Sequence, residues 1–330
     1  MNIVWLQSGG CSGCTMSLLC AEQPDLLSLS QLQGWRWRYF PSLSPQLPKG
    51  LPGLLAAVEQ GEWSLDVLCL EGAVMTGPDE SGAYHIAAGM DASMRDVLLR
   101  FIEQARYVVA VGSCAAFGGI TAAGPNPGEA VGLQYAHHLS GGLLSAVFRS
   151  RAGLPVINIA GCPVHPDWVT ETLLLLQQDA LDEADLDPLN RPRFYADKLV
   201  HHGCSRNEYY EYKASAEHLG ELGCMMEHLG CMGTLAHADC NQRSWNGQGC
   251  CTDAGYPCID CTAPTFGTRR HAYQETPKLG GIPVGLPTDM PKAWFIALSS
   301  LAKAATPERL KKNATAERPQ LPPPVKEIKL

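Results

Sequence analysis

The chain has 330 residues, of which 45% are hydrophobic and 18% are charged, and its formal net charge is -8. This composition is typical of a globular protein with a sizeable core and argues against a disordered chain. The length predicts one large domain or two ordinary domains. The negative charge without a long basic run argues against nucleic acid as a partner, and the absence of a long apolar run and of an export signal predicts a cytoplasmic protein with no membrane span.

Four short apolar runs in the first half predict β-strands at 2–6, 65–70, 106–111 and 154–160. Each run ends in a glycine-rich or polar turn, and the stretches between them, such as 89–105 and 166–184, are long enough for crossover helices. Because strands that alternate with helices form parallel sheets, we expect an α/β fold with helices on both faces of the sheet.

Four cysteines follow these strands within a few residues: Cys11, Cys14, Cys114 and Cys162. The loops after parallel strands all emerge at the carboxyl edge of the sheet, so residues far apart in sequence are expected to converge there. Four thiolates at one point are the ligand set of an iron–sulfur cubane or of a structural zinc ion.

The composition changes after about residue 185. The acidic, proline-containing stretch 182–194 is typical of a connector, and 200–266 is rich in Cys, His and Gly but has little periodic apolar pattern. Such a segment buries little hydrocarbon, so metal ligation would have to supply much of its order. We therefore expect a domain at 1–185, a metal-binding domain at 186–270, and a C-terminal extension at 271–330 whose last stretch, 306–330, is an extended polar tail.

Eight of the 14 cysteines lie between Cys204 and Cys261. Disulfides are rare in the cytoplasm, so dense cysteine there indicates metal or redox chemistry. The candidate ligands of this segment are His201, His202, Cys204, Cys224, Cys231, Cys240, Cys250, Cys251, Cys258 and Cys261. They suffice for two sites of four ligands each. With the first-half set, three sites would use His201 and 11 of the 14 cysteines, and Cys20, Cys69 and one of the pair Cys250 and Cys251 would be left over. The glycines beside the first-half cysteines favour iron–sulfur clusters over zinc, because cluster sulfurs accept backbone N–H bonds.

Several motifs in fixed order resemble one family. They are "SGGCSGCTMSLL", "LEGAVMTGP", "GSCAAFGGI" and "GCPVHPDW", then H-x2-C and the block "PCIDCTAPTF". Over about residues 3 to 266 the chain resembles the small subunit of a [NiFe] hydrogenase. The resemblance implies a flavodoxin-like domain, then a small domain with iron–sulfur clusters. It also implies a large subunit as partner, whose nickel–iron centre splits H2, so that this chain alone would be inactive.

The resemblance implies three clusters in a line, each with its own ligands. Cys11, Cys14, Cys114 and Cys162 would hold the proximal cluster, nearest the nickel–iron centre. Cys240, Cys251, Cys258 and Cys261 would hold the medial cluster. His201, Cys204, Cys224 and Cys231 would hold the distal cluster, where a neutral imidazole in place of a thiolate raises the reduction potential and suits electron exit.

Three departures from the family pattern refine this expectation. Cys251 stands where many members have proline and a three-iron medial cluster, so we predict a third [4Fe–4S] cluster, with Cys250 as the rival ligand. Gly13 and Gly119 stand where oxygen-tolerant members have two extra cysteines. The six residues between Cys224 and Cys231 resemble the H2-sensing, or regulatory, branch, whose partner would be a histidine kinase. The alternatives are a metabolic cytoplasmic uptake hydrogenase and, of another class, a structural zinc protein.

Some residues near these motifs have two interpretations each. Glu71 either assists proton movement near the proximal cluster or is a loop carboxylate bonded by nearby N–H groups. His165 is expected to order its loop, and His228 to be a structural histidine. The aromatic run 35–40 indicates strand and helix packing, or contact with the large subunit, with no chemistry of its own.

Overall fold

The computed structural model describes residues 1–22, 24–43, 50–268, 273–280, 282–284, 286 and 291–323. The chain forms two compact units. The N-terminal unit comprises Met1–Asp197 with Cys261–Thr268, and the C-terminal unit comprises Lys198–Asp260 with Arg269–Leu330. Within the described part of the chain, every helix is too short or too polar to cross a bilayer.

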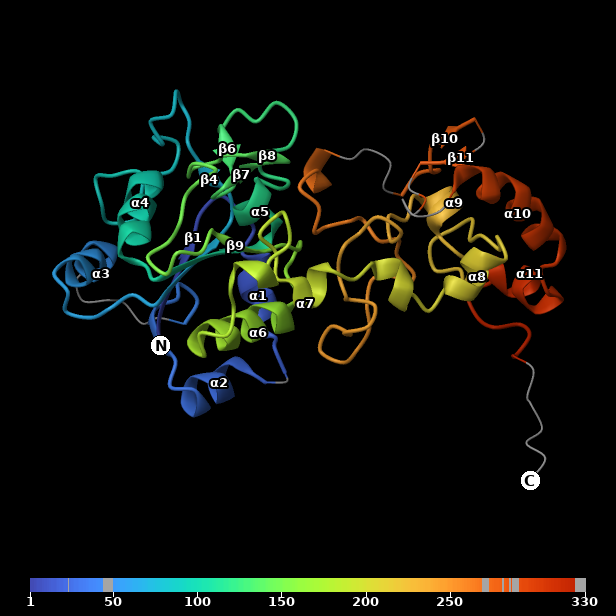
Figure 1. Ribbon diagram of the computed structural model, residues 1–330, viewed down its shortest axis with the longest axis horizontal. Coiled ribbons are helices and arrows are strands. Elements are labelled where there is room, and N and C mark those ends of the chain that lie inside the picture. The colour runs from blue at the N-terminus through green and yellow to red at the C-terminus, as the bar shows by residue number, and fades with distance from the viewer. Residues whose placement is uncertain are drawn as a thin grey trace. The chain divides into compact units, whose positions relative to one another are not determined.

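A five-stranded sheet forms the centre of the N-terminal unit (Figure 1). Its strands are β1 (Asn2–Gln7), β2 (Arg36–Tyr39), β3 (Val67–Glu71), β5 (Tyr107–Val111) and β9 (Ile157–Ile159). Every neighbouring pair is parallel, in the order β2-β1-β3-β5-β9. This is the flavodoxin-like order, in which the direction of winding changes beside β1. The predicted doubly wound α/β fold is confirmed.

Helices cover this sheet. They are α1 (Gly13–Leu19), α2 (Leu26–Leu32), α3 (Gly50–Glu59), α4 (Met94–Gln104), α5 (Gly112–Phe117), α6 (Pro166–Gln177) and α7 (Arg193–Ala196), with 3-10 turns at Glu183–Asp185 and Phe266–Thr268. α1 packs on α6, and α3 packs on α4. The main core joins Leu55 of α3 and Leu98 of α4 to Val4 and Leu6 of β1. Two short antiparallel ribbons, β4 (Val74–Met75) with β6 (Ala130–Val131) and β7 (Tyr135–Ala136) with β8 (Leu139–Ser140), complete the unit.

The four expected strands are present, and the sheet contains one more. β2 is an edge strand and, among the described strands, pairs only with β1. Its residues alternate between Arg and Trp or Tyr, a period of two that is typical of a half-buried strand. The packing interpretation of 35–40 is confirmed. The ring centroid of Phe40 lies 5.2 Å from the ring centroid of Trp5 and 5.2 Å from that of Trp37.

The helix expected at 166–184 is shorter in the structure. It begins at Pro166, where the ring nitrogen Nδ1 of His165 accepts the N–H of Asp167 at 3.2 Å and caps the helix. The expectation that His165 orders its loop is confirmed. The helix ends at Gln177, and Asp179 then adopts a left-handed φ of 51° that ends the helical path.

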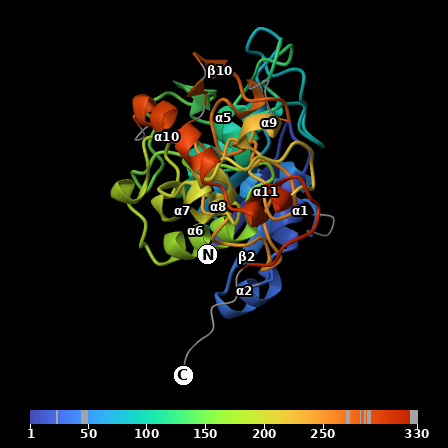
Figure 2. The same cartoon turned by 90° about the vertical axis from the view of Figure 1, so that its right-hand side faces the viewer.

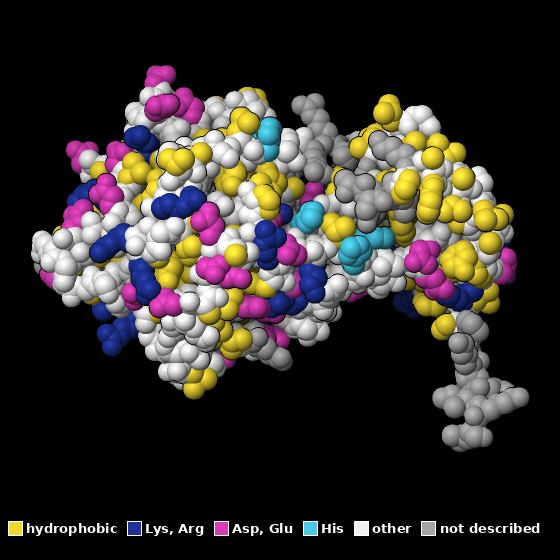
Figure 3. Space-filling view, in the orientation of Figure 1, with side chains coloured by type: hydrophobic (Ala, Val, Ile, Leu, Met, Phe, Trp, Pro, Cys, Tyr) yellow, Lys and Arg dark blue, Asp and Glu magenta, His cyan; other side chains and the backbone are white. Residues whose placement is uncertain are grey.

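Regular structure is sparse in the C-terminal unit (Figure 2). It consists of a 3-10 turn at Val200–Gly203, α8 (Asn207–Glu211), α9 (Met226–Leu229), β10 (Lys278–Leu279), β11 (Ile282–Pro283), α10 (Lys292–Ala304) and α11 (Glu308–Ala314). The small buried apolar clusters here include one of Ala214, Leu310 and Ala314. Four large side chains of α10, those of Trp294, Ile296, Leu298 and Leu301, are exposed. Hydrophobic side chains are visible on the surface of this unit (Figure 3).

The boundary between the units differs from the one expected at residue 185. Residues 186–197 pack on the N-terminal unit, because the N–H of Asn158 donates to the carbonyl of Asn190 at 2.8 Å and the hydroxyl of Tyr195 donates to the carbonyl of Asn158 at 3.0 Å. Residues 261–268 also return to this unit, where Nη1 of Arg191 donates to the carbonyl of Thr262 at 3.1 Å. The segment 186–270 is therefore divided between the units.

The expectation of an extended tail at 306–330 is wrong for its first part. α11 forms within this segment and buries Leu310 completely against the loop that carries Ala214. The side chain of Asn313 is also buried, and its amide oxygen accepts the N–H groups of Gln320 at 2.8 Å and Leu321 at 3.0 Å. Residues 324–330 lie outside the described part of the chain.

Candidate metal-cluster sites

The carboxyl edge of the sheet gathers Cys11, Cys14, Cys114 and Cys162 into one neighbourhood. Burial raises the pKa of Cys14, the negative charges of Glu71, Cys162 and Cys114 raise it further, and a hydrogen bond from the backbone of Val164 lowers it. Burial, with the negative charges of Cys114 and Cys11, raises the pKa of Cys162 to about 11. Thiols in such a place ionise readily only beside a strong cation, as a coordinated metal provides.

Glycines form the walls around the proximal thiols. A Cβ atom at Gly112 would lie 2.4 Å from Sγ of Cys14, and one at Gly119 would lie 2.9 Å from Sγ of Cys114. Both glycines have a positive φ, 84° and 53°, which strains any other residue. The donor set and this cradle fit an iron–sulfur cluster.

Gly13 adjoins the same site, since a Cβ there would lie 3.1 Å from Sγ of Cys11. Gly13 and Gly119 thus both border proximal thiols. These are the positions that the resemblance matched to the extra cysteines of oxygen-tolerant members, and this chain has no thiol at either.

Glu71 is the last residue of β3, and its carboxylate is buried under the C-x2-C loop. Oε1 accepts the backbone N–H of Cys14 at 2.9 Å and of Thr15 at 3.1 Å. Oε2 accepts from Gln7 Nε2 at 3.3 Å, from Trp5 Nε1 at 3.4 Å and from the hydroxyl of Thr15. This geometry is that of a positioning carboxylate that ties α1 to the sheet; the role in proton movement stays a prediction.

Ser113, which sequence reasoning missed, links three ligand loops. Its buried hydroxyl accepts the N–H of Gly161 at 3.0 Å and donates to the carbonyl of Cys261. Ser113 thus joins the loop of Cys114, the loop of Cys162 and the segment that begins at Cys261. Its place within "GSC", between a strand and a candidate ligand, is the only sequence feature that pointed to it.

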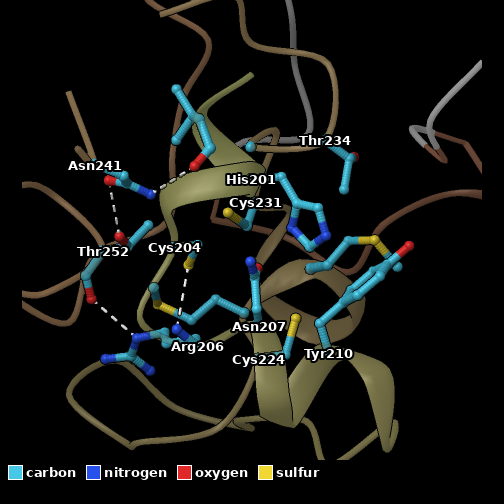
Figure 4. Close-up of a pocket in the computed structure, with 14 residues that line it drawn as sticks. His201, Cys204, Arg206, Asn207, Tyr210, Cys224, Cys231, Thr234, Asn241 and Thr252 are labelled. Carbon is cyan, nitrogen blue, oxygen red and sulfur yellow. Dashed lines mark hydrogen bonds between the residues drawn. The ribbon is translucent and has the colours of Figure 1, made fainter. Parts of the chain in front are cut away.

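The four residues expected at the distal site line one cavity of the C-terminal unit (Figure 4). They are His201, Cys204, Cys224 and Cys231. His201 comes from the 3-10 turn Val200–Gly203, and Cys224 and Cys231 flank α9. Burial lowers the pKa of His201, assisted by the charges of His202 and Lys213, so its imidazole is neutral and available as a ligand.

Backbone N–H groups point at the distal sulfurs. The N–H of Arg206 donates to Sγ of Cys204 at 3.4 Å, and the N–H of Cys258 donates to Sγ of Cys231 at 3.3 Å. Burial, with the nearby charges of Cys231 and Cys204, raises the pKa of Cys224 to about 12, although a hydrogen bond from the backbone of Met226 lowers it. Sulfur atoms that accept N–H bonds are typical of cluster ligands, and this donor set also fits an iron–sulfur cluster.

Arg206 is a second residue that sequence reasoning missed. Its buried guanidinium donates to three carbonyls: that of Thr252 from Nε at 2.9 Å, that of Gly223 from Nη1 at 2.7 Å, and that of Glu221, also from Nη1. These bonds join the loop after Cys204 to the loops before Cys224 and after Cys251. The sequence feature that pointed to Arg206 is its position two residues after the candidate ligand Cys204.

The four residues expected at the medial site are divided between the two units. Cys240, Cys251 and Cys258 lie in the C-terminal unit, and Cys261 begins the returning segment of the N-terminal unit. Among the residues that the structure describes, no group of three or more His, Cys, Asp or Glu side chains is arranged to hold a single metal ion. The assignment of ligands to each of the three clusters stays a prediction.

The rival cysteines Cys250 and Cys251 differ in their surroundings. Sγ of Cys250 lies 3.3 Å from both the hydroxyl of Thr252 and Oδ2 of Asp253, whereas Cys251 has no side-chain partner among the described residues. Cys69 is buried in β3, which raises its pKa, and Cys20 is exposed at the end of α1. Neither was assigned to a ligand set.

His228 lies away from the distal cavity. Its ring nitrogen Nε2 is 4.0 Å from Oε2 of Glu227, and it does not line the cavity of Figure 4. This position agrees with the expectation of a structural histidine.

Comparison with known proteins decides the family. Residues 11–176 match the family model described as NADH ubiquinone oxidoreductase, 20 Kd subunit, and residues 196–274 match the model for the C-terminal part of the NiFe/NiFeSe hydrogenase small subunit. The F420 non-reducing hydrogenase II small subunit of Methanosarcina mazei is 33% identical over 287 residues, which cover 80% of this chain and 73% of that protein. The chain belongs to the [NiFe] hydrogenase small-subunit family.

Further relatives of this small subunit agree. The periplasmic [NiFe] hydrogenase small subunit 1 of Nitratidesulfovibrio vulgaris is 31% identical and covers 83% of this chain and 82% of its own. Among solved structures, the actinobacterial-type NiFe-hydrogenase from Ralstonia eutropha H16 aligns with a TM-score of 0.74 and 28% identity over 93% of this chain and 92% of that one. This small subunit therefore shares its fold with a solved NiFe-hydrogenase chain over nearly its whole length.

Proposed function

We propose that this small subunit transfers electrons from H2 oxidation, in a heterodimer with a large subunit, through three [4Fe–4S] clusters. The observation that carries the proposal is the gathering of cysteines at two separate places. Cys11, Cys14, Cys114 and Cys162 meet at the edge of the sheet, and His201 with three cysteines lines one cavity of the other unit. When bound, iron–sulfur clusters accept and release single electrons.

The residues of this chain supply placement, shielding and hydrogen bonds. Glu71 fixes the C-x2-C loop, and Ser113 ties the loops of Cys114 and Cys162 together. At the distal site, His201 carries no charge as a ligand, which favours a higher potential than a fourth thiolate would. Because the distal cluster would have the higher reduction potential, electrons would leave the chain at the His201 end.

The role of the relay in H2 sensing is a finer proposal. It is supported by the six residues between Cys224 and Cys231, the spacing that resembles the regulatory branch. Metabolic H2 oxidation is the alternative, since the relatives compared above carry the names of hydrogenases and not of H2 sensors. A histidine kinase as partner, and the cytoplasm as location, are further proposals that pull-down and cell fractionation would test.

A substitution at the distal site tests the relay itself. In the purified heterodimer, Cys224→Ser is expected to abolish H2-driven reduction of benzyl viologen while the exchange of H2 with D2O, which needs only the nickel–iron centre of the partner, continues. Cys20→Ser, at an exposed cysteine outside the ligand sets, is the matched control and is expected to keep both activities. Undiminished dye reduction by Cys224→Ser would contradict the proposal.

A further inference from the structure

A second, larger cavity lies beside the distal site within the C-terminal unit. Its volume is about 400 Å³, in the range of small-molecule sites. Tyr210, Cys224 and Met226 line both this cavity and the distal one, so they form the wall between the two. A molecule in the larger cavity would contact the side chain of a proposed cluster ligand.

More cations than anions face this cavity. Lys213, Lys278 and Lys303 line it, and among the described residues of its lining Glu227 alone is acidic. Lys278 pairs with Glu227 at 2.9 Å, whereas Lys213 and Lys303 have no carboxylate within ion-pair distance among the described residues. The described residues of the cavity therefore carry an excess of positive charge, which would attract an anion.

Aromatic rings supply the apolar part of the same cavity. Nζ of Lys213 lies 4.3 Å from the ring centroid of Tyr210 and 4.6 Å from that of Phe295, and burial lowers the pKa of this lysine. The Tyr210 ring in turn lies edge-on to the ring of His201, with centroids 4.3 Å apart. A planar ring in the cavity would thus find aromatic neighbours one side chain away from a distal ligand.

A smaller hollow continues the charged surface. Its volume is about 280 Å³, and it shares Lys213, Ser215, Glu227 and Lys303 with the larger cavity. Lys311 of α11 adds another cation to its lining, and Glu217 adds another carboxylate. Among the described residues its three lysines outnumber its two carboxylates, so a smaller excess of positive charge extends beyond the larger cavity, with room for an acidic substituent on a bound ring.

We propose that this cavity binds a small, planar electron acceptor of the quinone or flavin type that carries a negatively charged group. The rings of Tyr210 and Phe295 would pack on the acceptor, and Lys213 and Lys303 would pair with its anion. The inference rests on the proposed relay, because it names the acceptor class at the distal end. For a quinone the balance is complete: one H2 yields two electrons and two protons, and the quinone takes two electrons, one at a time, and two protons from solvent to become a hydroquinone.

Equilibrium binding gives a test that does not depend on turnover. Anthraquinone-2,6-disulfonate, titrated into the purified heterodimer and followed by calorimetry, is expected to bind at one site per small subunit. Loss of one charge-assisted contact in Lys213→Gln is expected to weaken binding about tenfold. Lys303→Gln, at an exposed position of α10, is expected to weaken it in the same way and avoids any folding defect at the half-buried Lys213.

Lys312→Gln is the matched control. Lys312 is an exposed lysine of α11 that pairs with Glu308 at 3.5 Å and lines neither cavity, so binding should be unchanged. No binding of the disulfonate at millimolar concentration, or equal affinity in all three variants, would overturn the inference even while the heterodimer reduces benzyl viologen. Failure of the wild-type heterodimer to reduce benzyl viologen with H2 would instead count against the proposed relay.

Discussion

At the scale of single residues, the hydrogen bonds of Glu71 lead to the first prediction. Its carboxylate accepts from five donors, and the amide of Glu71→Gln would point an N–H group at some of them. We expect the apparent free energy of unfolding of the N-terminal unit to fall by about 1–3 kcal/mol, because buried donors lose their acceptor. Thermal unfolding of the heterodimer, with iron analysis, measures this.

The control for Glu71 separates its two interpretations. Glu103→Gln changes an exposed carboxylate of α4 and should leave stability unchanged. If Glu71→Gln kept full stability and iron but slowed the release of protons during H2 oxidation, Glu71 would belong to a proton path and the positioning role would be wrong.

The adjacent cysteines of the medial site give a second prediction at this scale. Cys250 has polar partners in Thr252 and Asp253, which supports Cys251 as the cluster ligand. We expect Cys251→Ala to convert the medial cluster into a three-iron form, with the loss of about one iron atom per chain and a new EPR signal in the oxidised protein. Cys250→Ala is expected to keep the wild-type spectrum; the reverse outcome would exchange the two assignments.

At the scale of elements, the sequence predicted the strands of the sheet better than its edge or the chain's end. β1, β3, β5 and β9 lie in buried apolar runs, so their pattern needs no tertiary information. The run that forms β2 was expected only to take part in strand and helix packing; its alternation of arginine with aromatic residues is typical of a strand, and packing on β1 fixes its place at the edge. α11 was missed because one buried leucine, Leu310, gives no apolar period, although Pro307, Glu308 and Lys312 stand where helices favour them.

The packing of α11 gives the third prediction. Leu310 is fully buried, so Leu310→Ala should leave a cavity and lower the free energy of unfolding of the C-terminal unit by about 2–5 kcal/mol. Leu301→Ala, an exposed leucine of α10, is the matched control and should change stability little. Chemical denaturation followed by tryptophan fluorescence compares the two; equal effects would mean that α11 does not pack as described.

At the scale of the whole molecule, the two units differ in the interactions that stabilise each of them internally. The N-terminal unit has a large apolar core around β1, β3 and β5, whereas the described apolar clusters of the C-terminal unit are small and its loops are joined by polar contacts such as those of Arg206. Convergence of the proximal cysteines could be predicted from the sequence, because sheet topology places their loops together. The division of 186–270 between the units could not, because it depends on single bonds such as that of Arg191 to Thr262.

This difference predicts the effect of removing metal. After anaerobic treatment with an iron chelator, we expect amides of the C-terminal unit to lose protection from hydrogen exchange, while those of β1, β3 and β5 stay protected by their apolar core. Mass spectrometry of peptides from both units measures this. Equal protection in the C-terminal unit before and after chelation would show that metal ligation does not order it.

The central claim, that this chain holds three [4Fe–4S] clusters, is tested most directly by metal and sulfide analysis. The small subunit, purified anaerobically with its large subunit, is expected to contain about 12 iron atoms and about 12 inorganic sulfides per chain, apart from the iron of the partner. Zinc without inorganic sulfide would contradict the account.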